Sequence, residues 1–466
     1  MINKYKRGVK KYRFALLFLL LMILMLWQSC NKNSGTPVVY NPPPALASLN
    51  ANVSLQWADL TLYTIRFSAF NTPTYASRSL GYLGVAMYES VVAGDAGKKS
   101  LNGQLTGLSL PQAQADEKYQ WTLSLNAAED TLLKLLYPVP KNSHAFIHHK
   151  IDSLYAKIFA EQSKNIDPVI VDRSVQFGQA IALAIYNWSV TDGGDKGYTR
   201  NFEPSFVFPA GDSYWVPPSF GQTVSPYPLH PHWGDTRPFV KADGEIPVPA
   251  IVPFSTDTGS VYYHLYKDVY DKNRVLTSQE MNIAAWWSDD PTQTFSPPGH
   301  SYYLASVAVK KSNASLVKAA ESFARTGIAV ADAFIHCWKA KYTYFNERPS
   351  TYVNKFIDSR WIQFWPEPPF PAFPSGHSIQ SAAAATVLTA LYGEPFPFTD
   401  SVFVGEYRSP YYSPLSARSF NSFWDAANEC AYSRFLGGIH TKQDNEVGAS
   451  DGRKVGNNVN ALQWDK

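Results

Sequence analysis

Apolar residues recur at three- and four-residue intervals through most of the chain between about residue 46 and residue 195. Segments such as TYASRSLGYLGVAMYESVV and DEKYQWTLSLNAAEDTLLKLLY place their apolar side chains on one face of an α-helix. The pattern resumes near Ser278 and continues to the end, while strand-like alternation is scarce. The sequence therefore predicts an all-α fold with helical regions at residues 46–195 and 276–466.

Residues 196–275 differ from both helical regions. This stretch is dense in proline, glycine and aromatic residues and has no sustained period. Aromatic side chains in such number need burial, so the sequence predicts a long ordered loop that packs on the helices.

The first 45 residues have the order of an export segment and a linker. Six positive charges fall within the first 13 residues, and the apolar run FALLFLLLMILMLW leads to QSC. This order predicts a signal peptide over residues 1–29 that is cleaved before Cys30. A lipid on Cys30 would then anchor the exported protein at the bacterial envelope, in the periplasm or at the outer membrane, with residues 30–45 as linker. The alternative is an uncleaved membrane helix, although the run is shorter than a typical span.

Composition and charge narrow the possible partners. Apolar residues make up 45% of the 466 residues and charged residues 17%, which is sufficient for a substantial core. The net charge is +3, and beyond the basic N-terminal segment the chain is mildly acidic. The sequence therefore predicts no nucleic-acid partner, and membrane contact only through the N-terminal anchor.

Lys341 and Arg348 stand seven residues apart in WKAKYTYFNERPS. On a continuous helix they would share one face, two turns apart. Pro349 disfavours helical geometry at Arg348, so the helix is expected to end there. Alone, the two residues fit either a solvated basic face or one side of an anion site.

The segment FPSGHS places Ser375, Gly376 and His377 at the start of an Ala-rich helical pattern. A helix N-terminus presents unpaired N–H groups and partial positive charge, and glycine lets an anion approach the backbone. His377 could exchange a proton beside that anion near neutral pH. The alternative is an ordinary Ser-capped helix with a surface histidine.

A third segment, SRFLGGIHTKQDNEVG, contains Arg434, His440 and Asp444. Gly437 and Gly438 break the first helical pattern, and the four-residue spacing puts His440 and Asp444 on one face of the next helix. A carboxylate there would fix one histidine tautomer and leave the other ring nitrogen free as nucleophile or metal ligand. The alternative is a pair on a helix surface.

In this order the three segments resemble the signature shared by type 2 phosphatidic acid phosphatases, bacterial acid phosphatases and vanadium-dependent haloperoxidases. Every signature position matches, and the resemblance extends from about Asn282 to Val455. It implies that His440 binds vanadium or becomes phosphorylated and that His377 is the acid–base group. It also implies an oxyanion, vanadate or phosphate, whose oxygens are bound by these residues: Lys341, Arg348, Ser375, Gly376 and Arg434.

The surroundings of the signature resemble the haloperoxidase branch. After the N-terminal segment no apolar run reaches membrane length, and the soluble acid phosphatases of the family are much shorter. Trp338 and Phe370 match residues that line the halide side in chloroperoxidases and bacterial iodoperoxidases. Asp290, with Asp289 nearly as good, matches a carboxylate that pairs with a site arginine. The resemblance implies two packed helical bundles of the vanadium haloperoxidase type.

The function implied by the resemblance is vanadate-dependent oxidation of a halide by hydrogen peroxide to hypohalous acid. His377 would take a proton from the peroxide, and Lys341 would polarise the bound peroxide. One alternative is a soluble phosphomonoesterase with His440 as nucleophile. Another is a surface protein that only binds phosphate.

Cys337 and Cys430 each stand four residues before a cation of the expected site. On helices both would face the site from one turn back. In an oxidising exported setting the two thiols could be bridged, so a disulfide between them is a hypothesis that a structure can test.

Overall fold

The structure, a computed structural model, describes residues 40–69, 71–138 and 145–466. The predicted signal peptide and Cys30 lie outside these residues. The chain divides into a small compact unit, which includes Asn165–Asp167, and a large unit of Pro43–Lys164 and Pro168–Lys466. Within the described ranges, no helix is both long and apolar enough to cross a membrane. Every site residue discussed below belongs to the large unit.

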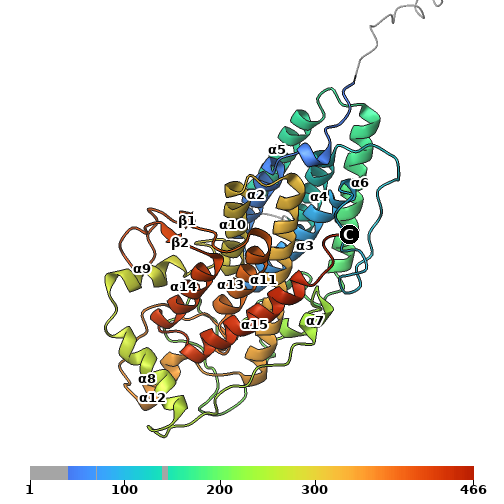
Figure 1. Ribbon diagram of the computed structural model, residues 1–466. Coiled ribbons are helices and arrows are strands. Elements are labelled where there is room, and N and C mark those ends of the chain that lie inside the picture. The colour runs from blue at the N-terminus through green and yellow to red at the C-terminus, as the bar shows by residue number, and fades with distance from the viewer. Residues whose placement is uncertain (1–39, 70, 139–144) are drawn as a thin grey trace, which may run out of the picture. The chain divides into compact units, whose positions relative to one another are not determined.

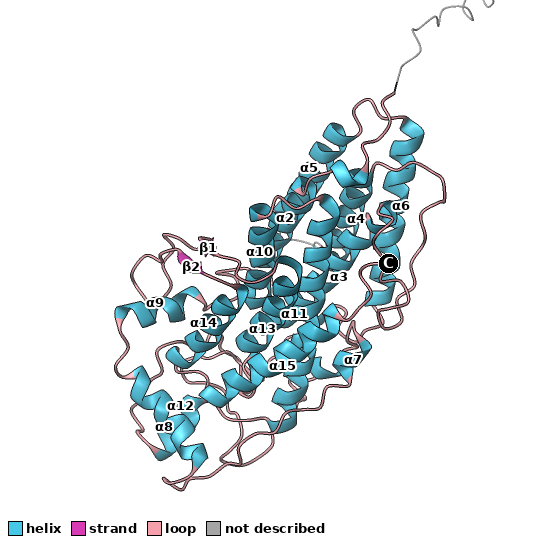
Figure 2. Cartoon of the chain, viewed as in Figure 1, coloured by secondary structure: helices cyan, strands magenta, loops and turns pink. Residues whose placement is uncertain are grey.

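The large unit is built almost entirely of helices (Figures 1 and 2), which confirms the all-α prediction. The N-terminal half contains α2 (Asn52–Phe67), α3 (Pro73–Glu89), α4 (Trp121–Leu136), α5 (Ala145–Gln162) and α6 (Pro168–Ser189). The C-terminal half contains α9 (Ser278–Trp286), α10 (Ser296–Lys311), α11 (Leu316–Tyr344), α12 (Pro349–Phe356), α13 (Gly376–Tyr392), α14 (Phe423–Leu436) and α15 (Lys442–Asn460). Strands β1 (Phe398–Asp400) and β2 (Arg418–Phe420) pair antiparallel, with Phe398 opposite Phe420.

The segment between the two halves is less irregular than predicted. It contains the short helix α7 (Lys241–Gly244) and the longer helix α8 (Val261–Asn273), so the prediction of a loop is wrong for residues 261–273. Ser260 caps α8 by accepting the N–H of Tyr263. The buried face of α8 includes Tyr262 and Tyr266, whose hydroxyl groups bond to each other at 3.0 Å. Because this face consists largely of tyrosines, the apolar period is hard to detect in the sequence.

Helix α11 is the central helix of the large unit. Its side chains are buried almost without interruption from Leu316 to Lys341, as expected for a helix that is apolar on nearly every face. It packs along α3 from the N-terminal half and along α13 from the C-terminal half, and the three lie side by side in Figure 1. Helix α11 thereby joins the two halves and carries Trp338 and Lys341 towards the start of α13.

A glycine face on α15 allows direct backbone packing on α13. Gly448, Gly452 and Gly456 recur every four residues, and a Cβ on Gly452 would lie 2.1 Å from the carbonyl oxygen of Ile379. No larger side chain fits such an approach without displacing a helix. The packing brings the start of α15 beside the start of α13, where the Ser375 N–H donates to the Asp444 carbonyl oxygen at 2.9 Å.

Candidate active site

Hydrogen bonds join the three predicted segments into one buried site. Arg348 Nη1 lies 3.0 Å from His440 Nε2, and Arg434 Nη1 lies 3.1 Å from His377 Nε2. Lys341 Nζ donates to the Pro374 carbonyl oxygen at 2.7 Å. We use the name cradle for the residues expected to surround the oxyanion: Lys341, Arg348, Ser375, Gly376, Arg434 and His440. None of their side chains is more than slightly exposed.

Lys341 and Arg348 reach the cradle from different elements. Helix α11 ends at Tyr344, and Arg348 is the extended residue that precedes α12. Helix α11 thus ends four residues before Arg348, where it was expected to end, and the two cations do not share one helical face. The reason is local: Phe345 adopts a left-handed φ of 48°, and Pro349 begins a new helix.

Backbone carbonyl groups surround the Lys341 ammonium group. Besides the bond to Pro374, Nζ donates to the carbonyl oxygens of Pro371 at 2.8 Å and Ala372 at 2.6 Å. Burial nevertheless lowers the pKa of Lys341 to about 7. Burial also lowers the pKa of Arg348 to about 10. Three cations clustered away from water are costly without an anion among them, so this site favours an anionic ligand.

Arg434, near the end of α14, is held through one nitrogen. Its Nη1 donates to the carbonyl oxygen of Trp287 at 2.9 Å and approaches that of Ser288 at 3.5 Å. Within the described ranges, its Nε and Nη2 have no hydrogen-bond partner although the side chain is fully buried. Unpaired buried donors on a cation are unfavourable. The free donors of Arg434 therefore fit a bound oxyanion.

His440 is held in one tautomer by Asp444. His440 Nδ1 lies 3.1 Å from Asp444 Oδ2, so Nδ1–H donates and Nε2 keeps its lone pair. Burial, followed by the charge of Arg348, holds the pKa of His440 well below its ordinary value. The structure corrects one detail, because His440 precedes the helix instead of lying on it. Thr441 is the N-cap of α15 and shares a capping box with Asp444.

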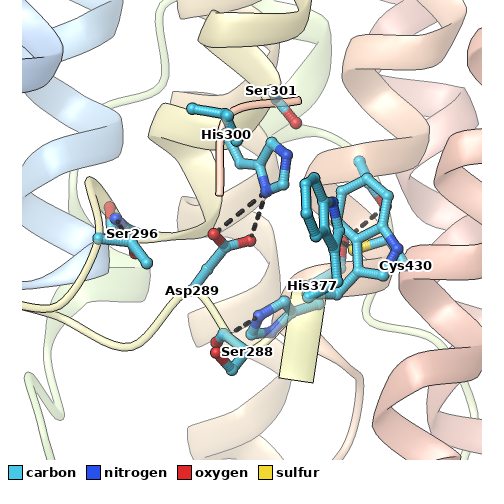
Figure 3. A network of polar contacts seen from close by, with 12 residues as sticks. Ser288, Asp289, Ser296, His300, Ser301, His377 and Cys430 are labelled. Atoms are coloured by element: carbon cyan, nitrogen blue, oxygen red, sulfur yellow. Dashed lines mark hydrogen bonds and ion pairs between the residues drawn. The ribbon is translucent and has the colours of Figure 1, made fainter. Parts of the chain in front are cut away.

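Ser375 is the N-cap of α13 and accepts the Ser378 N–H at 3.4 Å. His377, in the first turn, lies with Nε2 3.3 Å from the Ser288 carbonyl oxygen (Figure 3). Burial, followed by the charge of Arg434, holds the pKa of His377 well below its ordinary value. A neutral His377 can accept a proton near neutral pH.

The predicted halide-side residues line one cavity with the two histidines. Trp338, Phe370, His377 and His440 all border a cavity of about 460 Å³. The rings of Trp338 and Phe370 lie 4.9 Å apart, and Lys341 Nζ is 5.2 Å from the centre of the Phe370 ring. The structure thus combines an apolar wall with the cationic cradle.

Asp290 does not form the predicted pair with a site arginine. Among the described residues no ion pair joins it to Arg434; instead, Asp290 accepts hydrogen bonds from Trp365 Nε1, at 3.2 Å to Oδ2, and from Gln222 Nε2. Burial raises the pKa of Asp290 to about 7, while the charge of Arg434 opposes that rise. The charge of Arg434 therefore affects the pKa of Asp290 without a direct ion pair. The neighbouring Asp289 instead contacts His300, in a separate cluster described below.

The disulfide hypothesis is wrong, since Cys337 and Cys430 are both buried free thiols. Cys337 Sγ lies 3.6 Å from the Pro374 carbonyl oxygen, whereas Cys430 Sγ lies 3.9 Å from that of His377. The two thiols thus contact opposite ends of the segment that opens α13, instead of each other.

Sequence reasoning missed the residues that support the site from a distance along the chain. Gln222 and Trp365, which hold Asp290, carry no spacing signal. Ser288, whose carbonyl group faces Arg434 and His377, is visible only as a neighbour of the two aspartates in WWSDDP. Its role depends on the backbone, which side-chain motifs do not report.

Comparisons with known proteins identify the family of the chain. The sequence profile of the VCPO second helical-bundle domain matches residues 321–464. The crystal structure described as the first bacterial vanadium-dependent iodoperoxidase is 31% identical; the match covers 91% of this chain and 99% of that one, with a TM-score of 0.77. The chain therefore belongs to the vanadium-dependent haloperoxidase family.

Two further structures share the fold at low identity. The holo-type bacterial vanadium-dependent chloroperoxidase is 15% identical, with a TM-score of 0.67 over 88% of this chain and 97% of that one. The apo-type chloroperoxidase is 14% identical, with a TM-score of 0.68 over 89% and 98%. No curated protein matches the chain.

Proposed function

We propose that the protein is a vanadium-dependent haloperoxidase, which oxidises halide with hydrogen peroxide to hypohalous acid. The observation that carries this proposal is that, among the described residues, Nε and Nη2 of buried Arg434 have no hydrogen-bond partner. They lie in a cluster of cations beside two histidines whose pKa values burial holds well below the ordinary value. This arrangement suits a tetrahedral oxyanion, and membership of the family favours vanadate over phosphate.

The cradle residues divide the binding of vanadate between them. Lys341, Arg348 and Arg434 supply positive charge for its oxygens, and the Ser375 hydroxyl and the first N–H groups of α13 supply further donors. His440 supplies the Nε2 lone pair for the metal. When bound, vanadate supplies a Lewis acid that activates hydrogen peroxide towards the halide.

His377 moves the proton that the reaction requires. Overall, one halide, one hydrogen peroxide and one proton give hypohalous acid and water. A neutral His377 can take a proton from peroxide at Nε2, where the Ser288 carbonyl oxygen at 3.3 Å can accept the new N–H. The proton returns to the oxygen that leaves as water. Asp444 meanwhile keeps the Nδ1 proton on His440.

Iodide is the halide that we propose as the preferred substrate. Trp338 and Phe370 give the cavity an apolar wall, and a large, weakly hydrated anion loses least on leaving water for such a wall. The relative that is 31% identical is an iodoperoxidase, which supports the same choice.

The decisive experiment is a steady-state peroxidase assay with iodide, bromide and chloride, comparing apo and vanadate-loaded protein. We expect activity only after loading, highest with iodide, and its loss in His440→Ala. His336→Ala is the control, because it removes another buried histidine that pairs with a carboxylate, Asp451, at 3.0 Å. Hydrolysis of p-nitrophenyl phosphate that vanadate inhibits, without halide oxidation, would instead establish a phosphomonoesterase.

Export and lipid attachment at Cys30 are a separate proposal, supported by the basic, apolar and cysteine order of the first 30 residues. Cells grown with labelled palmitate should transfer label to the protein and not to Cys30→Ala. A labelled Cys30→Ala variant, or an unlabelled wild type, would contradict it.

A further inference from the structure

A buried cluster of one histidine and two aspartates lies outside the cradle, and its residues are not part of the three-segment sequence signature. His300, on α10, places Nδ1 2.9 Å from Asp289 Oδ2 and Nε2 2.7 Å from Asp400 Oδ2, at the end of β1. All three side chains are at most 1% exposed. Burial opposes a charge on His300, but the two carboxylates outweigh burial and raise its pKa to about 10. The cluster is therefore a charged triad.

The triad holds four consecutive residues, Trp286 to Asp289. Trp286 Nε1 donates to Asp400 Oδ2 at 3.0 Å, and the Trp287 ring stacks on His300 with ring centres 4.5 Å apart. Asp289 has a φ of 49°, a left-handed conformation that is uncommon outside glycine. Such a conformation persists where surrounding contacts fix it, and the bonds to His300 do so here.

The segment held in this way presents carbonyl groups to the cradle. Arg434 Nη1 bonds to the Trp287 carbonyl oxygen, and the Ser288 carbonyl oxygen lies within reach of both Arg434 Nη1 and His377 Nε2. Figure 3 shows the His300 ring directed at the Asp289 carboxylate and the His377 ring directed at Ser288. These carbonyl groups anchor Nη1 of Arg434, while its Nε and Nη2 have no partner in the part of the chain that the structure describes.

We propose that Asp289, His300 and Asp400 are positioning residues, which fix the Trp287 and Ser288 carbonyl groups and thereby orient Arg434 and His377 for a tetrahedral oxyanion. The inference rests on the proposed function only in requiring that the cradle binds such an anion. Without the triad, the peptide groups around Ser288 can rotate, and Arg434 then loses its anchor.

The test measures anion binding instead of turnover. Isothermal titration of the apo protein with orthovanadate, and separately with inorganic phosphate, gives the dissociation constants of wild type, His300→Gln, Asp289→Asn and Asp400→Asn. We expect His300→Gln to bind roughly 10- to 100-fold more weakly, as is typical when a group that orients a ligand is removed. His336→Gln breaks the other buried histidine–carboxylate pair and should stay within twofold of wild type.

A double-mutant cycle shows whether the triad acts through Arg434. If it does, His300→Gln should weaken binding far less in an Arg434→Lys background than in wild type. Full additivity would overturn the proposal, as would affinity within twofold of wild type in a folded His300→Gln or, should that variant not fold, in Asp289→Asn.

The remaining outcomes are also decisive. If none of the triad variants folds while His336→Gln does, the cluster serves folding alone and the proposal is overturned. A wild-type protein that binds both anions but oxidises no halide would refute the proposed function and leave this inference intact. A wild-type protein that binds neither anion overturns the inference.

Discussion

Replacement of Arg434 by lysine keeps the positive charge but removes the planar fork that lets one side chain serve two directions. Nη1 is occupied by backbone carbonyl groups, whereas Nε and Nη2 are free for an anion among the described residues. Lysine carries its donors on a single nitrogen, which cannot occupy the positions of Nη1, Nε and Nη2 at once, so we expect it to lose one of the two contacts to the anion. A hydrogen bond to a charged group contributes about 1.5–3 kcal/mol, so a net loss of one predicts roughly 10- to 100-fold weaker binding.

The assay for this prediction is titration of the apo protein with orthovanadate at neutral pH, combined with thermal unfolding of each variant. Arg78→Lys is the matched control. Arg78 is 2% exposed and forms an ion pair with Asp192 at 2.6 Å, so its replacement also damages a buried guanidinium pair. Arg78 contributes nothing to the cradle, and we expect this control to lose stability without losing affinity for the anion.

The reasoning is refuted if folded Arg434→Lys binds orthovanadate within threefold of wild type. That result would mean that Nε and Nη2 do not contact the anion. Equal loss of affinity in Arg434→Lys and Arg78→Lys would also refute it, because the effect would then follow from general destabilisation.

Three further predictions concern the surroundings of the cradle. Cys337 and Cys430 should resist alkylation in the native protein and both react after denaturation without reductant; protection after denaturation would contradict the free thiols. His377 and His440, neutral when folded, gain protons on unfolding in acid. Stability should therefore be complete above about pH 6.5 and fall below it by up to about 1.4 kcal/mol per pH unit for each histidine, until the lowered folded pKa is reached. Urea unfolding of wild type and His377→Gln checks this, and equal pH slopes would contradict it. Gly452→Ala should destabilise the protein by about 1–3 kcal/mol, because its Cβ would lie 2.1 Å from a backbone oxygen of α13; an unchanged urea midpoint would contradict the packing.

The spacing of apolar residues predicted the helices, because helix formation depends on residues that are close in the sequence. The apolar period identified most helices, because a helix buries one face whatever its partner. It missed α8, whose buried face includes tyrosines bonded through their hydroxyl groups. It also set His440 on a helix, although TKQD has the order of a capping box and marks Thr441 as the residue before the first turn.

Contacts between residues that are far apart in the sequence could not be predicted from the spacing of residues along the chain. The three cradle segments were recognisable because their residue types suit one anion, and the structure joins them by hydrogen bonds. The partner of His300 is different, because Asp400 lies in a strand far along the chain and belongs to no motif. Only the fold determines which carboxylate reaches a buried histidine, so the triad became visible only in three dimensions.

The proline-rich stretch before α13 explains how the cradle tolerates a buried lysine. Pro371 and Pro374 supply carbonyl oxygens to Lys341 Nζ but have no N–H of their own, so no opposing donor competes beside the cation. Even so, burial lowers the pKa of Lys341 to about 7, which leaves its charge incomplete at neutral pH. A nearby anion favours the charged form. Anion binding and full protonation of Lys341 therefore reinforce each other, and the cradle becomes fully cationic when its ligand arrives.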